Sequence, residues 1–193
     1  MSFVSIVARE NFINVMSDGR VTGSNDEVVD EEYQKYVSND KSFIAFAGTL
    51  ETCEMVVRDI KEIVFDNKDY VGAIYVLLGV FKQIKLEEKG MKVMMALGGV
   101  NKIGEIEFYT VDSIKKEAQT YIPKDDDIAY AFLNNTEHED VTLKSEFIGI
   151  LKETGFDTPS KSIQAQRLMN NNVADRDKSV NKKTFRAVIK KSN

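Results

Sequence analysis

The chain has 193 residues, enough for one domain of ordinary size, with 42% hydrophobic residues, 30% charged residues and a formal net charge of -5. The acidic balance gives no electrostatic argument for binding nucleic acid. The single cysteine, Cys53, excludes an internal disulfide and a zinc site built on paired cysteines. No apolar run is long enough to span a membrane, and no signal peptide pattern precedes the first strand. We therefore expect one soluble, cytoplasmic domain over residues 1–193 that binds neither membranes nor nucleic acid.

The first half of the sequence predicts strands followed by two helices. β-Branched residues in "SFVSIVAR" and "FINVMS" predict a hairpin within residues 3–17. The acidic stretch "SNDEVVDEEYQ" indicates a solvated loop, and "SFIAFAG" indicates a buried strand that ends at Gly48. From Thr49, apolar residues recur at helical spacing, with Cys53 on the apolar face. A second helix follows "DNKD", and we expect its buried face to comprise Val71, Ile74, Leu77, Leu78, Phe81 and Ile84.

The second half repeats this order of strands and then helices. "MKVMMALGG", "GEIEFYTVD", "AQTYIP" and "IAYAFL" each read as strands. Helical stretches follow at about Leu143 to Glu153 and Ser160 to Ala174, with Pro159 where a missing N–H costs little. The final "KTFRAVIKK" alternates cations with apolar residues and indicates a charged outer or edge strand. Strands in blocks and helices in pairs predict helices packed on antiparallel sheets.

Four stretches resemble successive segments of one family. They are "SDGRVTG", "FIAFAGTLET", "MALGGVNKIGEIEFYTVD" and "VADRDKSVNKKTFRAVIKK", in this order and over nearly the whole chain. Together they resemble proteasome β subunits and the bacterial HslV peptidase, in the N-terminal-nucleophile (Ntn) hydrolase superfamily. The resemblance implies an α+β fold, a four-layer αββα sandwich of two antiparallel sheets.

The resemblance also implies a nucleophile at Ser2. The family's nucleophile is the first residue of the mature chain, and Asp18, sixteen positions after Ser2, falls on its supporting acid. Removal of Met1 would expose an α-amine whose pKa of roughly 7.7–8.0 suits a base for the serine hydroxyl. The resemblance places an oxyanion-binding backbone N–H at Gly48.

Other family positions match less well. In a register without gaps, the family's catalytic lysine falls on Gln34, with Lys35 beside it. Because successive strand residues point to opposite faces, Lys35 would need a bulge or a one-residue slip to serve. The family's Gly-Ser-Gly stretch, expected after "DIAYA", is "FLNN" here. Asp177 matches the family's late aspartate, and Ser179 lies one residue short of the supporting serine.

Two functions follow from these matches. The missing lysine and serine loop favour a proteasome-like subunit with a degenerate, non-catalytic site that serves assembly or binding. The alternative is a serine-type amidase or peptidase that uses Ser2 after Met1 is removed. Proteasome-like subunits usually form rings, so we expect a homo-oligomer. We expect no cofactor or metal, because the single histidine, His138, excludes a multi-histidine site.

Overall fold

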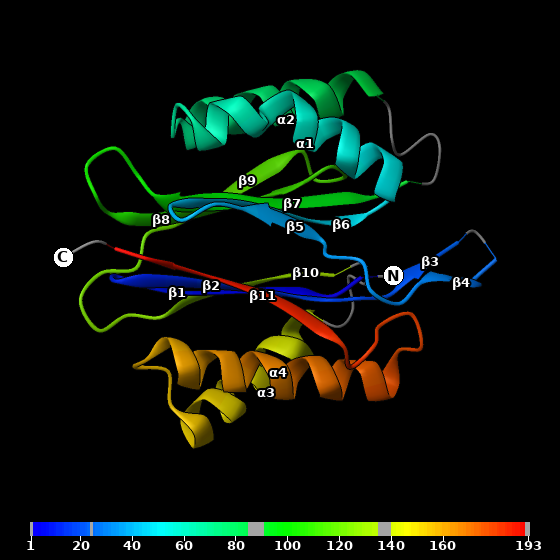
Figure 1. Ribbon diagram of the computed structural model, residues 1–193, viewed down its shortest axis with the longest axis vertical. Helices are drawn as coiled ribbons and strands as arrows, with labels where there is room; N and C mark the ends of the chain where they lie inside the picture. Colours follow the sequence, from blue (N-terminus) through cyan, green and yellow to red (C-terminus); the bar gives the residue numbers. More distant parts are fainter. Residues whose placement is uncertain (1, 24, 85–90, 135–139, 192–193) are drawn as a thin grey trace.

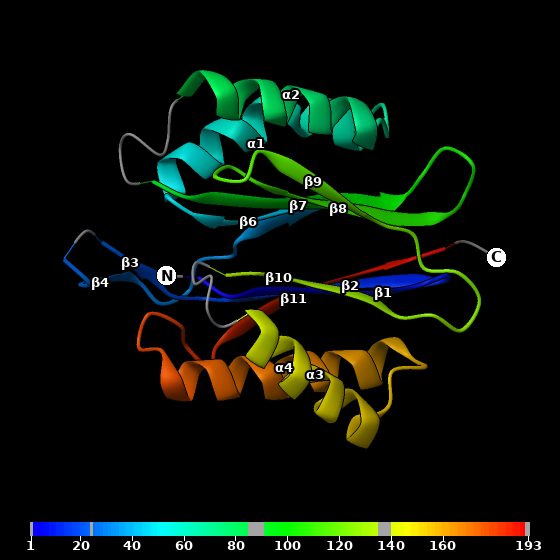
Figure 2. The same ribbon diagram turned by 180° about the vertical axis from the view of Figure 1, so that it is seen from behind.

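Two antiparallel sheets lie face to face, and a pair of helices covers the outer face of each sheet (Figures 1 and 2). The computed structural model describes residues 2–23, 25–84, 91–134 and 140–191, so Met1 and His138 lie outside the described residues. This arrangement confirms the predicted α+β, αββα sandwich. Within the described ranges, no helix combines the length and apolar character that a membrane span requires.

The first sheet carries the start of the chain. Its strand order is β10-β1-β2-β11, with β1 at Val4–Arg9, β2 at Phe12–Asp18, β10 at Ala129–Leu133 and β11 at Thr184–Lys190. β11 lies at an edge of this sheet, as its charged alternation predicted. β1 begins at the end of the sandwich from which β3 and β4 project (Figure 1).

The second sheet has the order β5-β6-β7-β8-β9. Its strands are β5 (Tyr36–Ser38), β6 (Ser42–Gly48), β7 (Val93–Val100), β8 (Ile106–Asp112) and β9 (Glu117–Tyr121). Every neighbouring pair in it is antiparallel. Aliphatic and aromatic side chains of the two sheets face each other and form a continuous core between them.

A short hairpin interrupts the stretch that we expected to be only a solvated loop. β3 (Val21–Thr22) pairs with β4 (Val28–Asp30), with an irregularity in the register. Val28 and Val29 are exposed on it. The acidic side chains nearby are solvated, as expected, but the backbone is paired.

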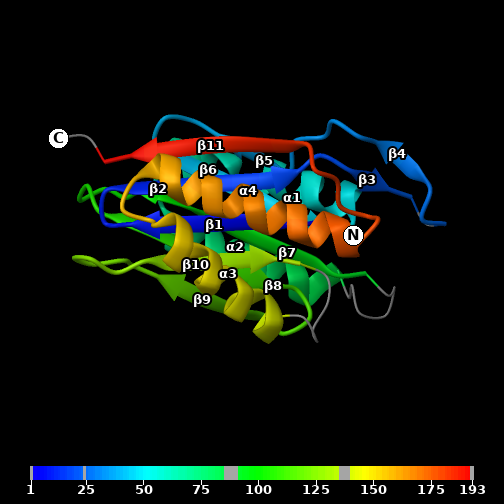
Figure 3. The same ribbon diagram turned by 90° about the horizontal axis from the view of Figure 1, so that it is seen from below.

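The helices cover the sheets in sequential pairs. α1 (Leu50–Phe65) and α2 (Tyr70–Ile84) lie on the second sheet, with Cys53 buried in this core as predicted. α3 (Asp140–Thr154) and α4 (Pro159–Arg176) lie side by side on the first sheet (Figure 3).

The buried face of α2 differs from the predicted one. Val71, expected inside, is 48% exposed, whereas Tyr70 and Ala73 are buried. The Tyr70 hydroxyl lies 2.8 Å from the Ser42 hydroxyl and donates to the carbonyl oxygen of Val100 at 3.2 Å. Because α2 is apolar almost all round, its periodicity alone did not determine which side faces the sheet.

Candidate functional site

Asp18 ends β2 with a carboxylate that is fully buried and holds three donors. Its Oδ1 accepts the backbone N–H of Phe3 at 2.8 Å and the Lys35 ammonium at 2.6 Å. Its Oδ2 accepts the backbone N–H of Arg20 at 2.9 Å. Since Phe3 directly follows Ser2, this carboxylate fixes the start of the chain relative to Lys35.

Lys35 is the cation of this pair and is only 2% exposed. Burial lowers its pKa, the Asp18 carboxylate opposes that shift, and the nearby Arg20 cation adds to it. Its backbone is held as well, because its carbonyl accepts the N–H of Phe46 at 3.0 Å. A buried lysine with a lowered pKa beside a cavity is a common feature of functional sites.

Lys35, and not Gln34, therefore pairs with the Asp18 carboxylate. Gln34 is exposed, and its amide donates to the carbonyl of Tyr36 at 3.0 Å. The sequence argument assumed that these residues belong to a strand, but β5 begins only at Tyr36. In the irregular segment before it, the N–H of Tyr33 donates to the carbonyl of Gly19. Strand alternation does not apply there, so Lys35 turns inward without a bulge.

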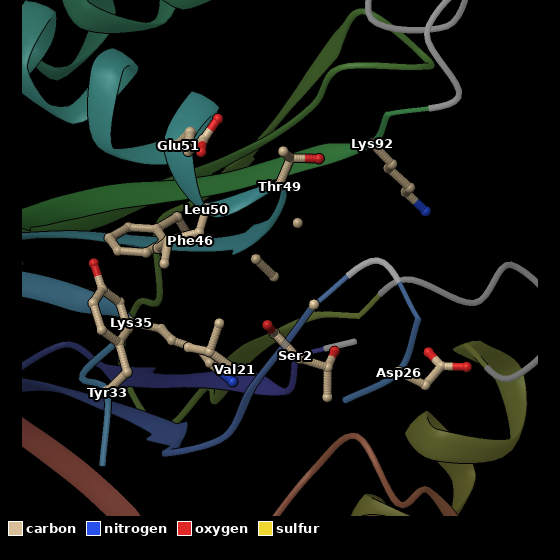
Figure 4. Close-up of a pocket in the computed structure, with 14 residues that line it drawn as sticks. Ser2, Val21, Asp26, Tyr33, Lys35, Phe46, Thr49, Leu50, Glu51 and Lys92 are labelled. Carbon is tan, nitrogen blue, oxygen red and sulfur yellow. The ribbon is translucent and has the colours of Figure 1, made fainter. Parts of the chain in front are cut away.

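Ser2 and Lys35 line the same cavity, which has a volume of about 620 Å³. Figure 4 shows Ser2 in its middle, with Tyr33 and Lys35 on one side and Lys92 on the other. The remaining lining residues come from the β3–β4 hairpin and from the junction of β6 with α1: Val21, Thr22, Gly23, Asp26, Phe46, Ala47, Gly48, Thr49, Leu50 and Glu51.

At Gly48 the cavity is lined by backbone atoms without a side chain. Its φ is +125°, a region that side chains rarely adopt, and a Cβ there would lie 2.1 Å from the carbonyl oxygen of Lys92. The pairing of β6 with β7 places Gly48 opposite Val93. Only glycine allows this close approach of the two strands at the cavity.

Asp177 and Ser179 form a turn of their own. The N–H and the hydroxyl of Ser179 both donate to Oδ1 of Asp177, at 2.8 Å and 2.6 Å. The turn contacts the site indirectly, because the Arg20 guanidinium donates to the carbonyl of Lys178. Neither Asp177 nor Ser179 is among the described residues that line the cavity of Ser2.

Two cavity residues were missed by the sequence reasoning. Tyr33 donates its hydroxyl to the Glu54 carboxylate at 2.6 Å, and burial raises its pKa. Lys92 reaches the cavity because β7 pairs with β6, which the sequence segments do not reveal. No local motif marks either residue.

Comparison with known proteins gives a single line of support. No protein-family model and no curated protein matches the sequence. Among solved structures, the chain is similar to eukaryotic HslV from Trypanosoma brucei, with a TM-score of 0.68 and 15% sequence identity. The match covers 97% of this chain and 99% of that one. At this identity the likeness establishes the fold and nothing finer. The chain therefore has the fold of HslV, the mixed α+β, proteasome-type Ntn-hydrolase fold that the four sequence segments led us to expect.

Proposed function

We propose that this protein is a serine-type N-terminal-nucleophile hydrolase of amide or peptide bonds, with Ser2 as the nucleophile. The observation that carries the proposal is the buried pair of Lys35 and Asp18 at the cavity that Ser2 lines. The sequence arguments for a degenerate site were the apparent loss of the lysine to Gln34 and the missing serine loop. The pair of Lys35 and Asp18 supplies a cation at the site and so supports the catalytic candidate against the first of them.

The chemistry requires removal of Met1, which leaves an α-amine on Ser2. The Ser2 hydroxyl attacks the substrate carbonyl while this amine accepts the hydroxyl proton. The amine then returns the proton to the leaving nitrogen as the C–N bond breaks, and water hydrolyses the resulting ester. The Lys35 charge stabilises the negative charge that develops on the Ser2 oxygen, and the N–H of Gly48 is our candidate donor to the oxyanion.

Asp18 acts in this proposal as a positioning residue. It binds the Phe3 N–H and the Lys35 ammonium with one oxygen, so the nucleophile and the cation share one rigid support. A buried cation without a carboxylate would be costly, so Asp18 also keeps Lys35 in place.

A non-catalytic subunit is the second candidate. It is favoured by the turn of Asp177 and Ser179, whose side chains bond to each other and not to the cavity. Both candidates agree with a homo-oligomer, for which the exposed apolar side chains of Val71 and Tyr75 on α2 provide a surface. A monomeric mass by light scattering would contradict the oligomer.

Mass spectrometry separates the two candidates. Untagged protein from its natural host is expected to lack Met1, and a fluorophosphonate probe is expected to label Ser2, as mapped on peptides. Ser2→Ala retains a small second residue, so it allows the same processing but removes the label. Ser145→Ala, at an exposed serine of α3, is the matched control and should label normally. Retained Met1 together with an unlabelled Ser2 would establish the non-catalytic candidate instead.

A further inference from the structure

A second, smaller cavity adjoins the one that Ser2 lines. Its volume is about 130 Å³, and it lies among β8, β9, β10 and the start of β7. Lys92 lines both cavities, so its side chain stands where the two meet. In Figure 4, Lys92 lies on the side of Ser2 opposite to Tyr33. A substrate that crosses Ser2 from the larger cavity would therefore arrive at Lys92.

Asn134 supplies a hydrogen-bond donor to the small cavity. It is 9% exposed, and its Nδ2 is buried without a hydrogen-bond partner among the described residues. The pairing of Val4 with Leu133 brings the start of β1 and the end of β10 to the same place, so Asn134 lies at the Ser2 end of the sandwich. Burial of an amide donor without an acceptor is unfavourable, and such groups need an explanation. A bound acceptor would provide one.

The charges at this cavity favour an anion as that acceptor. Three lysines line it: Lys92 inside, and Lys115 and Lys144, which are exposed, at its rim. Two carboxylates, those of Asp112 and Glu117, also line the cavity.

The Asp112 carboxylate is already engaged by the protein. Its Oδ1 accepts the N–H groups of Ile114 and Lys115 at 2.8 Å and 3.1 Å. Its Oδ2 lies 3.8 Å from Nζ of Lys92, a long contact for an ion pair. Because an ammonium has three donors, Lys92 retains donors for a second anion.

We propose that the small cavity binds the free α-carboxylate of the leaving group, so that the substrates are N-acyl amino acids and peptides cleaved before their last residue. This rests on the proposed function of Ser2. The acyl part occupies the larger cavity, and the leaving amino acid lies with its carboxylate on Lys92 and the Nδ2 of Asn134. Ser2 forms an ester with the acyl group as the C–N bond breaks, and the nitrogen leaves with a proton as a free amino acid. Water then releases the acyl group as a carboxylic acid. The volume of about 130 Å³ suits one small residue.

Paired substrates test the carboxylate directly. An acylated dipeptide and its C-terminal amide differ only in the charged group, and kcat/KM is expected to favour the carboxylate at least about tenfold. Asn134→Asp keeps the side-chain shape but adds a negative charge, so it should abolish this preference. Asn171→Asp adds the same charge on α4 and should change neither rate. Equal cleavage of both substrates by the wild-type protein would overturn the proposal.

Binding measurements separate this proposal from that for Ser2. Calorimetry with Ser2→Ala measures affinity for the two dipeptides whether or not Ser2 is the nucleophile, and the carboxylate form is expected to bind at least about tenfold tighter. Lys115→Glu, at an exposed position that should not affect folding, is expected to weaken that binding severalfold. If the wild-type protein cleaves neither dipeptide but the carboxylate form binds more tightly, the proposed role of Ser2 is overturned and the proposed carboxylate site is supported. Equal binding of both forms would overturn the carboxylate site alone.

Discussion

Two buried polar clusters in this molecule differ in charge and in surroundings. The first, at the end of β2, joins the charged side chains of Asp18 and Lys35 beside a large cavity. The second, between α4 and the first sheet, is neutral. There the amide of Gln166 donates to the carbonyl and hydroxyl of Ser5, at 2.9 Å and 3.1 Å, and the amide of Asn14 donates to the carbonyl of Pro159 at 2.9 Å.

The difference indicates what each cluster is for. In the neutral cluster, Oε1 of Gln166 and Oδ1 of Asn14 have no partner in the described part of the chain, and the contacts fix α4 on the sheet. In the charged cluster, both carboxylate oxygens of Asp18 have donors. Replacing a buried ion pair by apolar residues is often neutral or stabilising, so stability alone does not explain keeping it. The charged cluster therefore fits the chemistry of the proposed function, whereas the neutral cluster holds α4 on the sheet.

The largest effect is expected from Asp18→Ala. The substitution leaves Lys35 as a buried cation without its carboxylate, which should lower the free energy of unfolding by about 3–5 kcal/mol. Denaturant titration measures the loss. The double variant Asp18→Ala/Lys35→Met buries no charge and should recover a substantial part of it. Equal losses in the single and double variants would show that the pair is not coupled.

Gln166→Leu tests the neutral cluster and should cost less. The carbonyl of Ser5 loses its side-chain donor, so we expect a loss of about 1–3 kcal/mol in the free energy of unfolding. Labelling of Ser2 should be unchanged, because this cluster serves the fold. Gln164→Leu, an exposed glutamine on the same helix, is the matched control and should stay within about 0.5 kcal/mol of the wild type. Loss of Ser2 labelling in a folded Gln166→Leu variant would contradict the assignment of the neutral cluster to the fold alone.

The pH dependence of stability gives a smaller effect that belongs to the charged cluster. Burial lowers the pKa of Lys35 below its ordinary 10.5. Between the folded value and 10.5 the unfolded chain binds more protons, so the free energy of unfolding rises with pH in this window relative to Lys35→Met. The buried thiol of Cys53 and the phenols of Tyr36 and Tyr70 have the opposite effect. Burial raises the pKa of each to about 12, so the stability they contribute is lost at alkaline pH.

Those three groups are present in both proteins, so their contributions cancel in the difference between the wild type and Lys35→Met. Urea titrations of the two proteins from pH 7 to 11 provide the comparison. A difference that falls with pH would mean that the folded pKa of Lys35 is raised, contrary to the effect of burial.

Ser179→Ala has the smallest expected effect on stability. It tests whether the turn of Asp177 and Ser179 belongs to the charged cluster. Loss of the hydrogen bond from its hydroxyl to Asp177 should reduce the free energy of unfolding by about 0.5–1.5 kcal/mol. The rate of Ser2 labelling should remain within about twofold of the wild-type rate. A much larger fall in labelling, with folding intact, would add this turn to the chemical site.

The spacing of Ser2 and Asp18 and the order of the strands and helices could be predicted from the sequence, because both depend on local patterns along the chain. β-Branched residues identified β1 and β2, an apolar run identified β6 as a buried strand, and helical periodicity identified α1. The buried face of α2 was predicted incorrectly, because an almost uniformly apolar helix gives no direction. Whether Val71 or Tyr70 faces inward depends on how the helix packs on the sheet beneath it.

The contents of the site required the tertiary structure. The sequence by itself determined the fold class, because the order of strands and helices is set by local patterns and four segments resemble one family. The same resemblance pointed to Ser2 and Asp18. Lys35 replaced Gln34 only because the segment before β5 is irregular and is held by contacts with Gly19 and Ser17, distant in the chain. Lys92 and Asn134 reached the neighbourhood of Ser2 through strand pairing. Such pairing joins residues whose separation along the chain carries no local signal, and so only the folded chain brought them together.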